Sequence, residues 1–202
     1  MRGNTMLKKD ILADWVKNNN GVLKVSDAIN MDISSNYLFE YIKKNEFVKA
    51  SKGIYLHPDM WEDQLYMMQL RYKQVVFSHE TALYLLDLAE REPLRYTVTA
   101  KAHYNSKNLR QGNTKVYTVK EELFELGITE VKTPMNNMVN CYNAERTLCD
   151  IVRNRNNTDK QELIAALKNY TKRKERNIPQ LMRYAKEFRV EKVMRQYMEV
   201  LL

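Results

Sequence analysis

Residues 25–56 read VSDAINMDISSNYLFEYIKKNEFVKASKGIYL, and this stretch decides the fold that we expect for the first part of the chain. Its spacing predicts a short helix over 25–30 and a tight turn over 31–33. Ser34 is a favourable N-cap, because its hydroxyl can accept a hydrogen bond from the first turn of the helix that follows. The stretch therefore predicts two helices joined by a turn, the second over 34–44.

The residues on either side extend this pattern. Upstream, a helix over 7–19 is predicted by apolar residues that recur at helical spacing, namely Ile11, Leu12, Trp15 and Val16. Val22 and Leu23 are too few for more than a stub of strand. Downstream, the apolar runs 47–50 and 54–56 flank a tight turn and predict a β-hairpin. Three helices followed by a hairpin is the order of a winged helix-turn-helix domain, which we place at residues 1–58.

The remainder, residues 59–202, predicts a mixed domain with a small sheet and a C-terminal helical bundle, so the fold class is α+β. Apolar runs predict strands at 75–77, 95–100, 115–119 and about 130–133. Helical spacing predicts helices at 60–72, from Ser78, and from about 143, 159, 177 and 190 onward. Residues 104–114 are polar and predict a loop.

The charge of the chain favours nucleic acid as a partner. The formal net charge is +8 and the isoelectric point is near 9.3. Residues 1–58 carry a net +3, residues 59–140 a net −1, and residues 141–202 a net +6. Clustered Lys and Arg release counterions when they neutralise phosphates, which favours DNA binding.

A winged helix domain predicts which side chains contact DNA, because the helix after the turn enters the major groove and the wing reaches the backbone. Base or adjacent phosphate contacts are predicted for the start of that helix, at Ser34, Ser35, Asn36 and Tyr37. Phosphate contacts are predicted for the helix end and the wing, at Lys43, Lys44, Lys49, Ser51 and Lys52. A second basic cluster is either a solvated helix end or a further phosphate-contacting patch, and consists of Lys172, Arg173, Lys174 and Arg176.

No pattern predicts an enzyme, a metal site or a cofactor. His79 and Glu80 are adjacent at a helix start, but no second His follows at the spacing of a zinc helix. Glu121, Glu122 and Glu125 are close in sequence and read as one exposed helix face. Two cysteines, Cys141 and Cys149, are expected to be reduced and packed. Neither a membrane-spanning run nor a signal peptide is present, so we expect a cytoplasmic protein in which residues 1–5 form a short polar lead.

Several segments resemble the AbiEi-type antitoxins of bacterial abortive-infection toxin–antitoxin systems. The segments are residues 21–34, Tyr37-Leu38, residues 51–55, the block YKQVVFSHETALYL at 72–85, RYTVT at 95–99 and NAERTLCD at 143–150. The resemblance covers most of the chain. It departs from the family at Lys24, Asp32 and Ser35, which affects specific base contacts more than the fold.

The resemblance implies an antitoxin that represses its own operon by binding inverted repeats in the promoter through the winged helix. The C-terminal domain would counteract a toxin that resembles a nucleotidyltransferase, without necessarily touching it. We expect a monomer that pairs on DNA. Three alternatives remain: a DNA-binding regulator unrelated to toxins, a nucleic-acid-processing enzyme with a DNA-binding head, and a winged helix that binds another protein.

Overall fold

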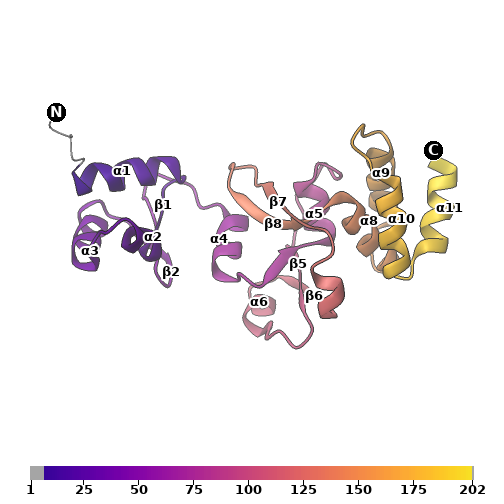
Figure 1. The fold of residues 1–202 in the computed structure, drawn as a ribbon, viewed down its shortest axis with the longest axis horizontal. Coiled ribbons are helices and arrows are strands. Elements are labelled where there is room, and N and C mark those ends of the chain that lie inside the picture. The colour runs from indigo at the N-terminus through magenta and orange to yellow at the C-terminus, as the bar shows by residue number, and fades with distance from the viewer. Residues whose placement is uncertain (1–6, 202) are drawn as a thin grey trace. The chain divides into compact units, whose positions relative to one another are not determined.

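Three helices and three short strands form the first part of the chain in the computed structural model, which describes residues 7–201. The helices are α1 (Lys8–Asn18), α2 (Val25–Asn30) and α3 (Ser35–Lys44), and the strands are β1 (Val22–Lys24), β2 (Val48–Ser51) and β3 (Ile54–Leu56) (Figure 1). The strands form one antiparallel sheet in the order β1-β3-β2. The polar lead expected at residues 1–5 lies outside the described residues.

The helices of this part are held by one apolar core. Leu12 of α1, Leu23 of β1 and Leu38 of α3 are all fully buried in it. The stub of strand expected at Val22 and Leu23 is a true strand, because Leu23 pairs with Tyr55 of β3 while its side chain enters the core. Burial of Leu23 in the core therefore stabilises a strand that is too short to predict from a run of three residues.

The chain divides into two compact units, Met1–Arg71 and Tyr72–Leu202. This division lies beyond the boundary expected after residue 58. The reason is α4 (Gln64–Arg71), which belongs to the first unit because its Met67 is buried against Val22 and Ile54. The helix begins at Gln64 rather than at residue 60.

A five-stranded mixed sheet organises the second unit. Its strands are β4 (Val75–Phe77), β5 (Thr97–Lys101), β6 (Lys115–Val119), β7 (Ile128–Lys132) and β8 (Met138–Tyr142), in the order β6-β5-β4-β8-β7. The pairs β4–β8 and β5–β6 are parallel and the other two are antiparallel. β8 was not expected from the sequence, although it lies between β4 and β7 and contains the buried Cys141.

Three short helices connect these strands, and four longer helices follow them. The short ones are α5 (His79–Leu85), α6 (Lys107–Gln111) and α7 (Glu121–Phe124), and the long ones are α8 (Ala144–Arg153), α9 (Lys160–Thr171), α10 (Ile178–Glu187) and α11 (Glu191–Leu201). The helix α6 lies in the segment predicted to be a loop. Figure 1 shows α8 to α11 gathered at one end of the unit. Together the units form an α+β chain, as the sequence predicts.

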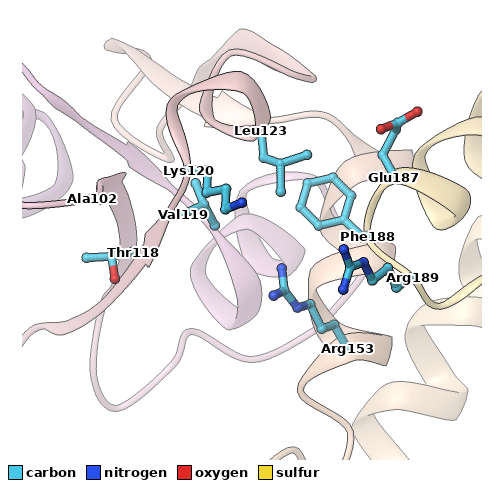
Figure 2. Close-up of a pocket in the computed structure, with 9 residues that line it drawn as sticks. All are labelled: Ala102, Thr118, Val119, Lys120, Leu123, Arg153, Glu187, Phe188 and Arg189. Atoms are coloured by element: carbon cyan, nitrogen blue, oxygen red, sulfur yellow. The ribbon is translucent and has the colours of Figure 1, made fainter.

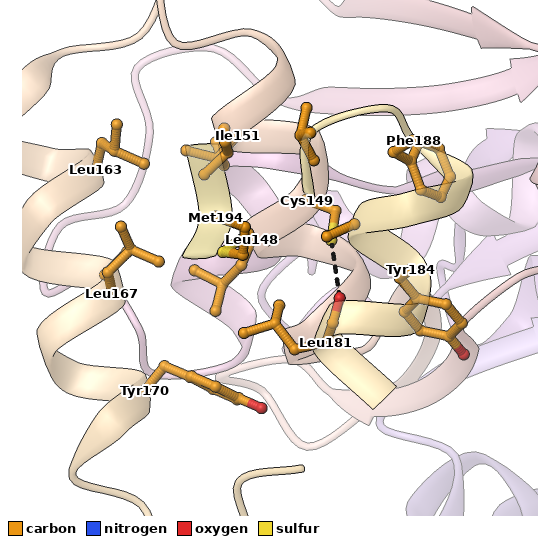
Figure 3. Packing of buried hydrophobic residues seen from close by; sticks show 14 of the residues in the cluster. Leu148, Cys149, Ile151, Leu163, Leu167, Tyr170, Leu181, Tyr184, Phe188 and Met194 are labelled. Atoms are coloured by element: carbon orange, nitrogen blue, oxygen red, sulfur yellow. Dashed lines mark hydrogen bonds between the residues drawn. The ribbon is translucent and has the colours of Figure 1, made fainter. Parts of the chain in front are cut away.

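Apolar side chains from α8, α9, α10 and α11 meet in the largest core of the second unit (Figure 3). Four of these side chains are fully buried, namely Leu148, Ile151, Leu167 and Met194. Both cysteines are buried and free, and Cys149 Sγ lies 3.7 Å from the Leu181 carbonyl oxygen. Side-chain caps start three of these helices, at Asn143, Asp159 and Asn177.

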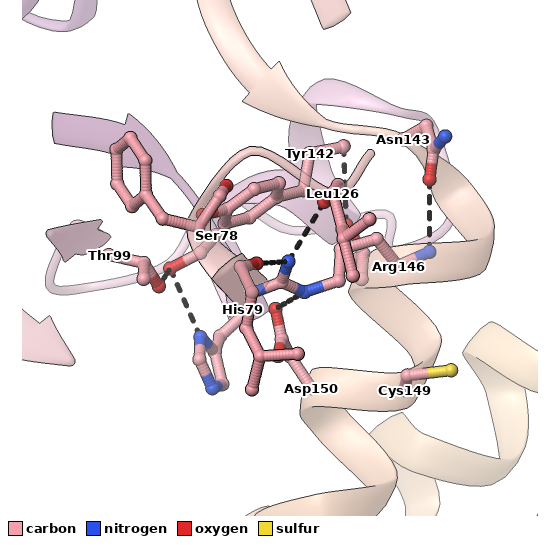
Figure 4. Close-up of polar contacts among 12 residues, drawn as sticks. Ser78, His79, Thr99, Leu126, Tyr142, Asn143, Arg146, Cys149 and Asp150 are labelled. Atoms are coloured by element: carbon pink, nitrogen blue, oxygen red, sulfur yellow. Dashed lines mark hydrogen bonds and ion pairs between the residues drawn. The ribbon is translucent and has the colours of Figure 1, made fainter. Parts of the chain in front are cut away.

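A buried arginine joins this core to the sheet. The Arg146 side chain of α8 is fully buried, and its Nε donates to Asp150 Oδ2 at 3.0 Å (Figure 4). Its Nη1 donates to the carbonyl oxygens of Leu123 at 2.5 Å and Leu126 at 2.8 Å. The guanidinium lies 4.0 Å from the ring centres of both Tyr142 and Phe188. One side chain therefore connects α7, β8, α8 and the end of α10.

The backbone next to Arg146 has to be glycine. Gly127 has φ +80°, and a Cβ at that position would lie 2.7 Å from Arg146 Cβ. The Gly127 carbonyl oxygen also accepts a hydrogen bond from the backbone N–H of Asn143 at 2.7 Å. The left-handed conformation and the close approach both exclude a side chain there.

Replacing Arg146 with Met is expected to lower the free energy of unfolding by about 3–5 kcal/mol, because Asp150 is left as a buried charge without its partner. Urea unfolding followed by circular dichroism measures the effect. The double variant Arg146→Met/Asp150→Leu should recover part of the loss. A single variant that costs less than about 1 kcal/mol would show that the pair does not support the fold.

Candidate nucleic-acid interface

One face of α3 is open to solvent. Leu38 and Ile42 are buried, and at 100° per residue the opposite face carries Asn36, Glu40 and Lys43. All three of these side chains are exposed. Lys44 is also exposed and lies beside this face, whereas Ser35, although exposed at the first position of the helix, lies toward the side of Leu38 and Ile42. The structure thus brings Asn36, Lys43 and Lys44 together on one surface.

Two of the predicted contact residues have structural roles. Ser34 is the N-cap of α3, and its Oγ accepts a hydrogen bond from the Tyr37 amide at 3.5 Å. Tyr37 is half-buried against the apolar core of the first unit. Its ring lines a small cavity together with Tyr41 and Lys9 of α1. Tyr37 therefore lies on the α1 side of the helix rather than in the middle of its open face.

The β2–β3 hairpin adds further exposed cations. Lys49 and Lys52 are exposed, and Ser51 is partly so, next to a shift in register between β2 and β3. Lys43, Lys44, Lys49 and Lys52 form no ion pair with any carboxylate in the described residues. Unpaired cations keep their full charge available to a polyanion.

The open face of α3 also carries residues that the sequence analysis did not select. Phe39 is 46% exposed, and its ring contacts the edge of the Tyr55 ring at a centroid distance of 6.3 Å. This contact joins α3 to β3. Glu40 is the acidic exception, because it lies between Asn36 and Lys43 on the same face. A carboxylate there repels phosphates but can accept a hydrogen bond from cytosine N4.

The second basic cluster lies in the other unit, between α9 and α10. Lys172, Lys174 and Arg176 are exposed. Arg173 differs, because its guanidinium donates to the Leu86 carbonyl oxygen at the end of α5. Arg173 therefore holds two segments of the unit together. Its three neighbours are exposed, and Arg176 Nη1 donates to the Arg173 carbonyl oxygen at 2.8 Å.

Glu121, Glu122 and Glu125 are exposed on the second unit. Lys101 Nζ lies 2.9 Å from Glu121 Oε1 and 2.9 Å from Glu125 Oε1, on the surface of the unit. Within residues 7–201, no group of three or more His, Cys, Asp or Glu is arranged to hold a metal ion. Nor is any helix of that range both long and apolar enough to cross a membrane.

His79 has the surroundings of a structural histidine. Its ring stacks on Tyr117 at a centroid distance of 3.8 Å. Its Nδ1 lies 3.0 Å from Ser78 Oγ (Figure 4). Burial, together with the nearby positive charges of Lys115, Arg146 and Arg153, lowers the pKa of His79 to about 3. The imidazole is neutral at pH 7 and joins α5 to β6.

Neighbouring polar groups complete this connection. Ser78 Oγ accepts from Thr99 Oγ1 at 2.9 Å, and Glu80 Oε2 accepts from Thr97 Oγ1 at 3.1 Å. Lys115 Nζ lies 3.7 Å from Glu80 Oε1. These contacts attach the start of α5 to β5 and β6, so the Ser-His-Glu block has a structural explanation.

The sequence analysis missed three cations of the second unit that line one cavity, Lys120, Arg153 and Arg189. They come from three separate segments, and no spacing in the sequence connects them. The only available signal was the net positive charge of residues 141–202.

Comparisons with known proteins inform the fold alone. No family model and no curated protein matches the chain. A crystal structure of the RV2827C protein from Mycobacterium tuberculosis matches it with a TM-score of 0.54 and 10% sequence identity, over 87% of this chain and 70% of that one. The chain is therefore similar in fold to that protein over most of both lengths.

The neutral state of His79 predicts a pH dependence of stability. Its pKa is lower in the folded chain than the ordinary value of 6.5, so the unfolded chain binds more protons between pH 6.5 and about 3. The His79 contribution is therefore fully present above pH 6.5 and falls as the pH drops, by up to about 1.4 kcal/mol per pH unit.

Urea unfolding between pH 7.5 and pH 4, compared with a His79→Asn variant, measures this contribution. Asn is the appropriate replacement because His79 has φ +49°, a conformation that Asn tolerates. The gap in stability between the two proteins should narrow with acidification. A constant gap would mean that His79 titrates normally in the folded chain.

Proposed function

We propose that the chain is a DNA-binding autorepressor and an antitoxin of the AbiEi type. In this proposal the first unit is a winged helix-turn-helix domain that binds inverted repeats in its own promoter. The second unit, with its C-terminal helical bundle, counteracts a nucleotidyltransferase-like toxin in the cytoplasm. No catalytic residue and no cofactor is assigned to either unit.

One observation carries the DNA-binding half of the proposal. The open face of α3 is flanked by four exposed lysines that no carboxylate in the described residues neutralises, Lys43, Lys44, Lys49 and Lys52. The order of helices and hairpin in this unit is that of a winged helix, whose last helix enters the major groove while its hairpin follows the backbone. Lysines at both places provide phosphate contacts on either side of the base-reading residues.

The proposed division of labour on α3 follows from its geometry. Asn36 lies in the first turn and reads a base, because its amide can pair bidentately with adenine. Glu40 lies one turn further along the same face and accepts from cytosine. Lys43 then binds phosphate at the end of the helix. Two monomers that pair on DNA present these groups to half-sites one helical turn apart.

The antitoxin half is supported by the resemblance and by where its blocks lie. The block at 72–85 contains β4 and the start of α5, the block at 95–99 enters β5, and the block at 143–150 caps and begins α8. Side chains of the first two blocks are hydrogen-bonded to each other, through Ser78 and Thr99 and through Glu80 and Thr97. The blocks thus support a shared interior, within which Arg146 is buried.

Removing the charge of the lysines on α3 and the hairpin is expected to weaken binding to all DNA sequences to a similar degree. The variant Lys43→Gln/Lys49→Gln/Lys52→Gln should lose at least tenfold in affinity for the chain's own promoter. The slope of log affinity against log salt should fall in magnitude by about 0.9 for each phosphate contact removed. Electrophoretic mobility shift at several salt concentrations measures both quantities.

The matched control removes the same charge from α1, as Lys8→Gln/Lys9→Gln/Lys17→Gln, and should change the slope less. Asn36→Ala should instead reduce the preference for the promoter over random DNA by about 1–3 kcal/mol. Equal effects of the two lysine sets would contradict the assignment of α3 and the hairpin as the interface.

The two activities should also separate in the full chain. The variant Lys43→Gln/Lys49→Gln/Lys52→Gln should fail to repress a promoter–reporter fusion. It should still protect cells from the proposed nucleotidyltransferase-like toxin. Expression from an independent promoter keeps the amount of protein constant. Loss of protection in a folded, equally abundant variant would place the antitoxin activity in the first unit and refute this division.

A further inference from the structure

A cavity of about 410 Å³ opens on the second unit, where the end of β6, the start of α7, the end of α8 and the end of α10 come together. Its volume lies within the range of small-molecule sites, which runs from roughly 300 to 1,000 Å³. Three cationic side chains line it, Lys120, Arg153 and Arg189. Figure 2 shows their charged ends directed toward a shared space, with the Glu187 carboxylate turned away from it.

The three cations are available to a ligand. All are exposed, and none forms an ion pair within the part of the chain that the structure describes. Arg153 has a ring contact instead, with its guanidinium 6.0 Å from the Phe188 ring centre. Cations directed toward one space can bind an oxyanion through charge-assisted hydrogen bonds.

The walls of the cavity are apolar and fixed. Leu123 and the buried Phe188 form one side. The far face of this wall is supported by Arg146, whose guanidinium lies 4.0 Å from the Phe188 ring centre. Arg189 has φ +58° directly after Phe188, so the backbone turns sharply there to bring its side chain to the cavity. Because other contacts already hold these walls in place, little conformational entropy is lost when a ligand binds.

A second cavity of about 240 Å³ adjoins the first, with which it shares Thr118, Val119 and Arg153. Its lining includes the stacked rings of His79 and Tyr117 and the side-chain amide of Asn154. Asn154 Nδ2 donates to the Tyr117 hydroxyl at 2.6 Å. The Asp150 carboxylate is also part of this lining. The cationic end of the site is thus continuous with a hydrogen-bonding end.

We propose that these joined cavities bind a small phosphorylated ligand of the nucleotide class. The phosphate lies among Lys120, Arg153 and Arg189, where Arg can bind it bidentately. The sugar lies along Leu123 and Val119, and the base reaches the polar end beside Tyr117 and Asn154. Arg153 lines both cavities and is therefore the central residue of the site. This ligand site is additional to the proposed DNA contacts of the first unit.

Isothermal titration of the full chain with AMP, GMP, CMP and UMP tests the proposal. At least one nucleotide should bind with a dissociation constant below about 1 mM, and inorganic phosphate and ribose 5-phosphate should each bind at least tenfold more weakly. The variant Lys120→Gln/Arg153→Gln/Arg189→Asn should lose at least tenfold in affinity for that nucleotide. Asn is chosen at residue 189 because it tolerates positive φ.

A matched variant, Lys160→Gln/Lys168→Gln/Lys192→Gln, removes the same charge from exposed positions on α9 and α11 and should bind as the parent does. Thermal unfolding of each variant reports that it is folded, and the single variant Arg153→Gln serves if the triple one is not. Binding that is absent for all four nucleotides, or equal in both triple variants, overturns the proposal. Ribose 5-phosphate binding as tightly as the nucleotides overturns the role of the base.

Discussion

The second unit depends on a single buried ion pair. Arg146 and Asp150 are one turn apart on α8, and both are almost entirely removed from water. Burial raises the pKa of Asp150 to about 6, although Arg146 opposes this by favouring the charged carboxylate. The desolvation cost of such a pair is repaid only with additional hydrogen bonds. The Leu123 and Leu126 carbonyls supply them, so the segment after α7 has to lie where it does.

Regular periodicity made much of the fold predictable, and short or irregular elements limited the prediction. The helices α1, α3 and α9 to α11 repeat apolar residues at helical spacing, and caps such as Ser34 and Asp159 mark where they begin. β8 was missed because its alternation of buried and more exposed residues spans only five residues, directly after a polar turn. The two compact units divide after Arg71 rather than after residue 58, because Met67 packs against Val22 and Ile54 in a tertiary contact that spacing along the sequence does not show.

The two candidate sites differ in how far the sequence predicts them, because one is built from residues close together in the sequence and the other is not. The DNA contacts predicted on α3 and the hairpin are local in sequence: Asn36 and Tyr37 were selected because they lie near the start of the helix, and Lys43 because it lies near its end. Position along the helix does not show which side a residue faces, and Tyr37 packs toward α1. The cations of the second unit come from three segments, and only the folded chain brings Arg153 and Arg189 together.

Burial also determines what each part of the sequence reveals about function. The blocks that resemble AbiEi-type antitoxins contain Ser78, His79, Arg146 and Asp150, which are buried and bonded to each other or to the backbone. Interior residues of this kind specify how the unit folds, since replacing them leaves buried polar groups without partners. In the functions proposed above, partner recognition instead depends on exposed groups, namely the lysines beside α3 and the cations around Phe188. Two chains can therefore share the interior of this unit and still differ in the ligand, DNA sequence or toxin that their surfaces recognise.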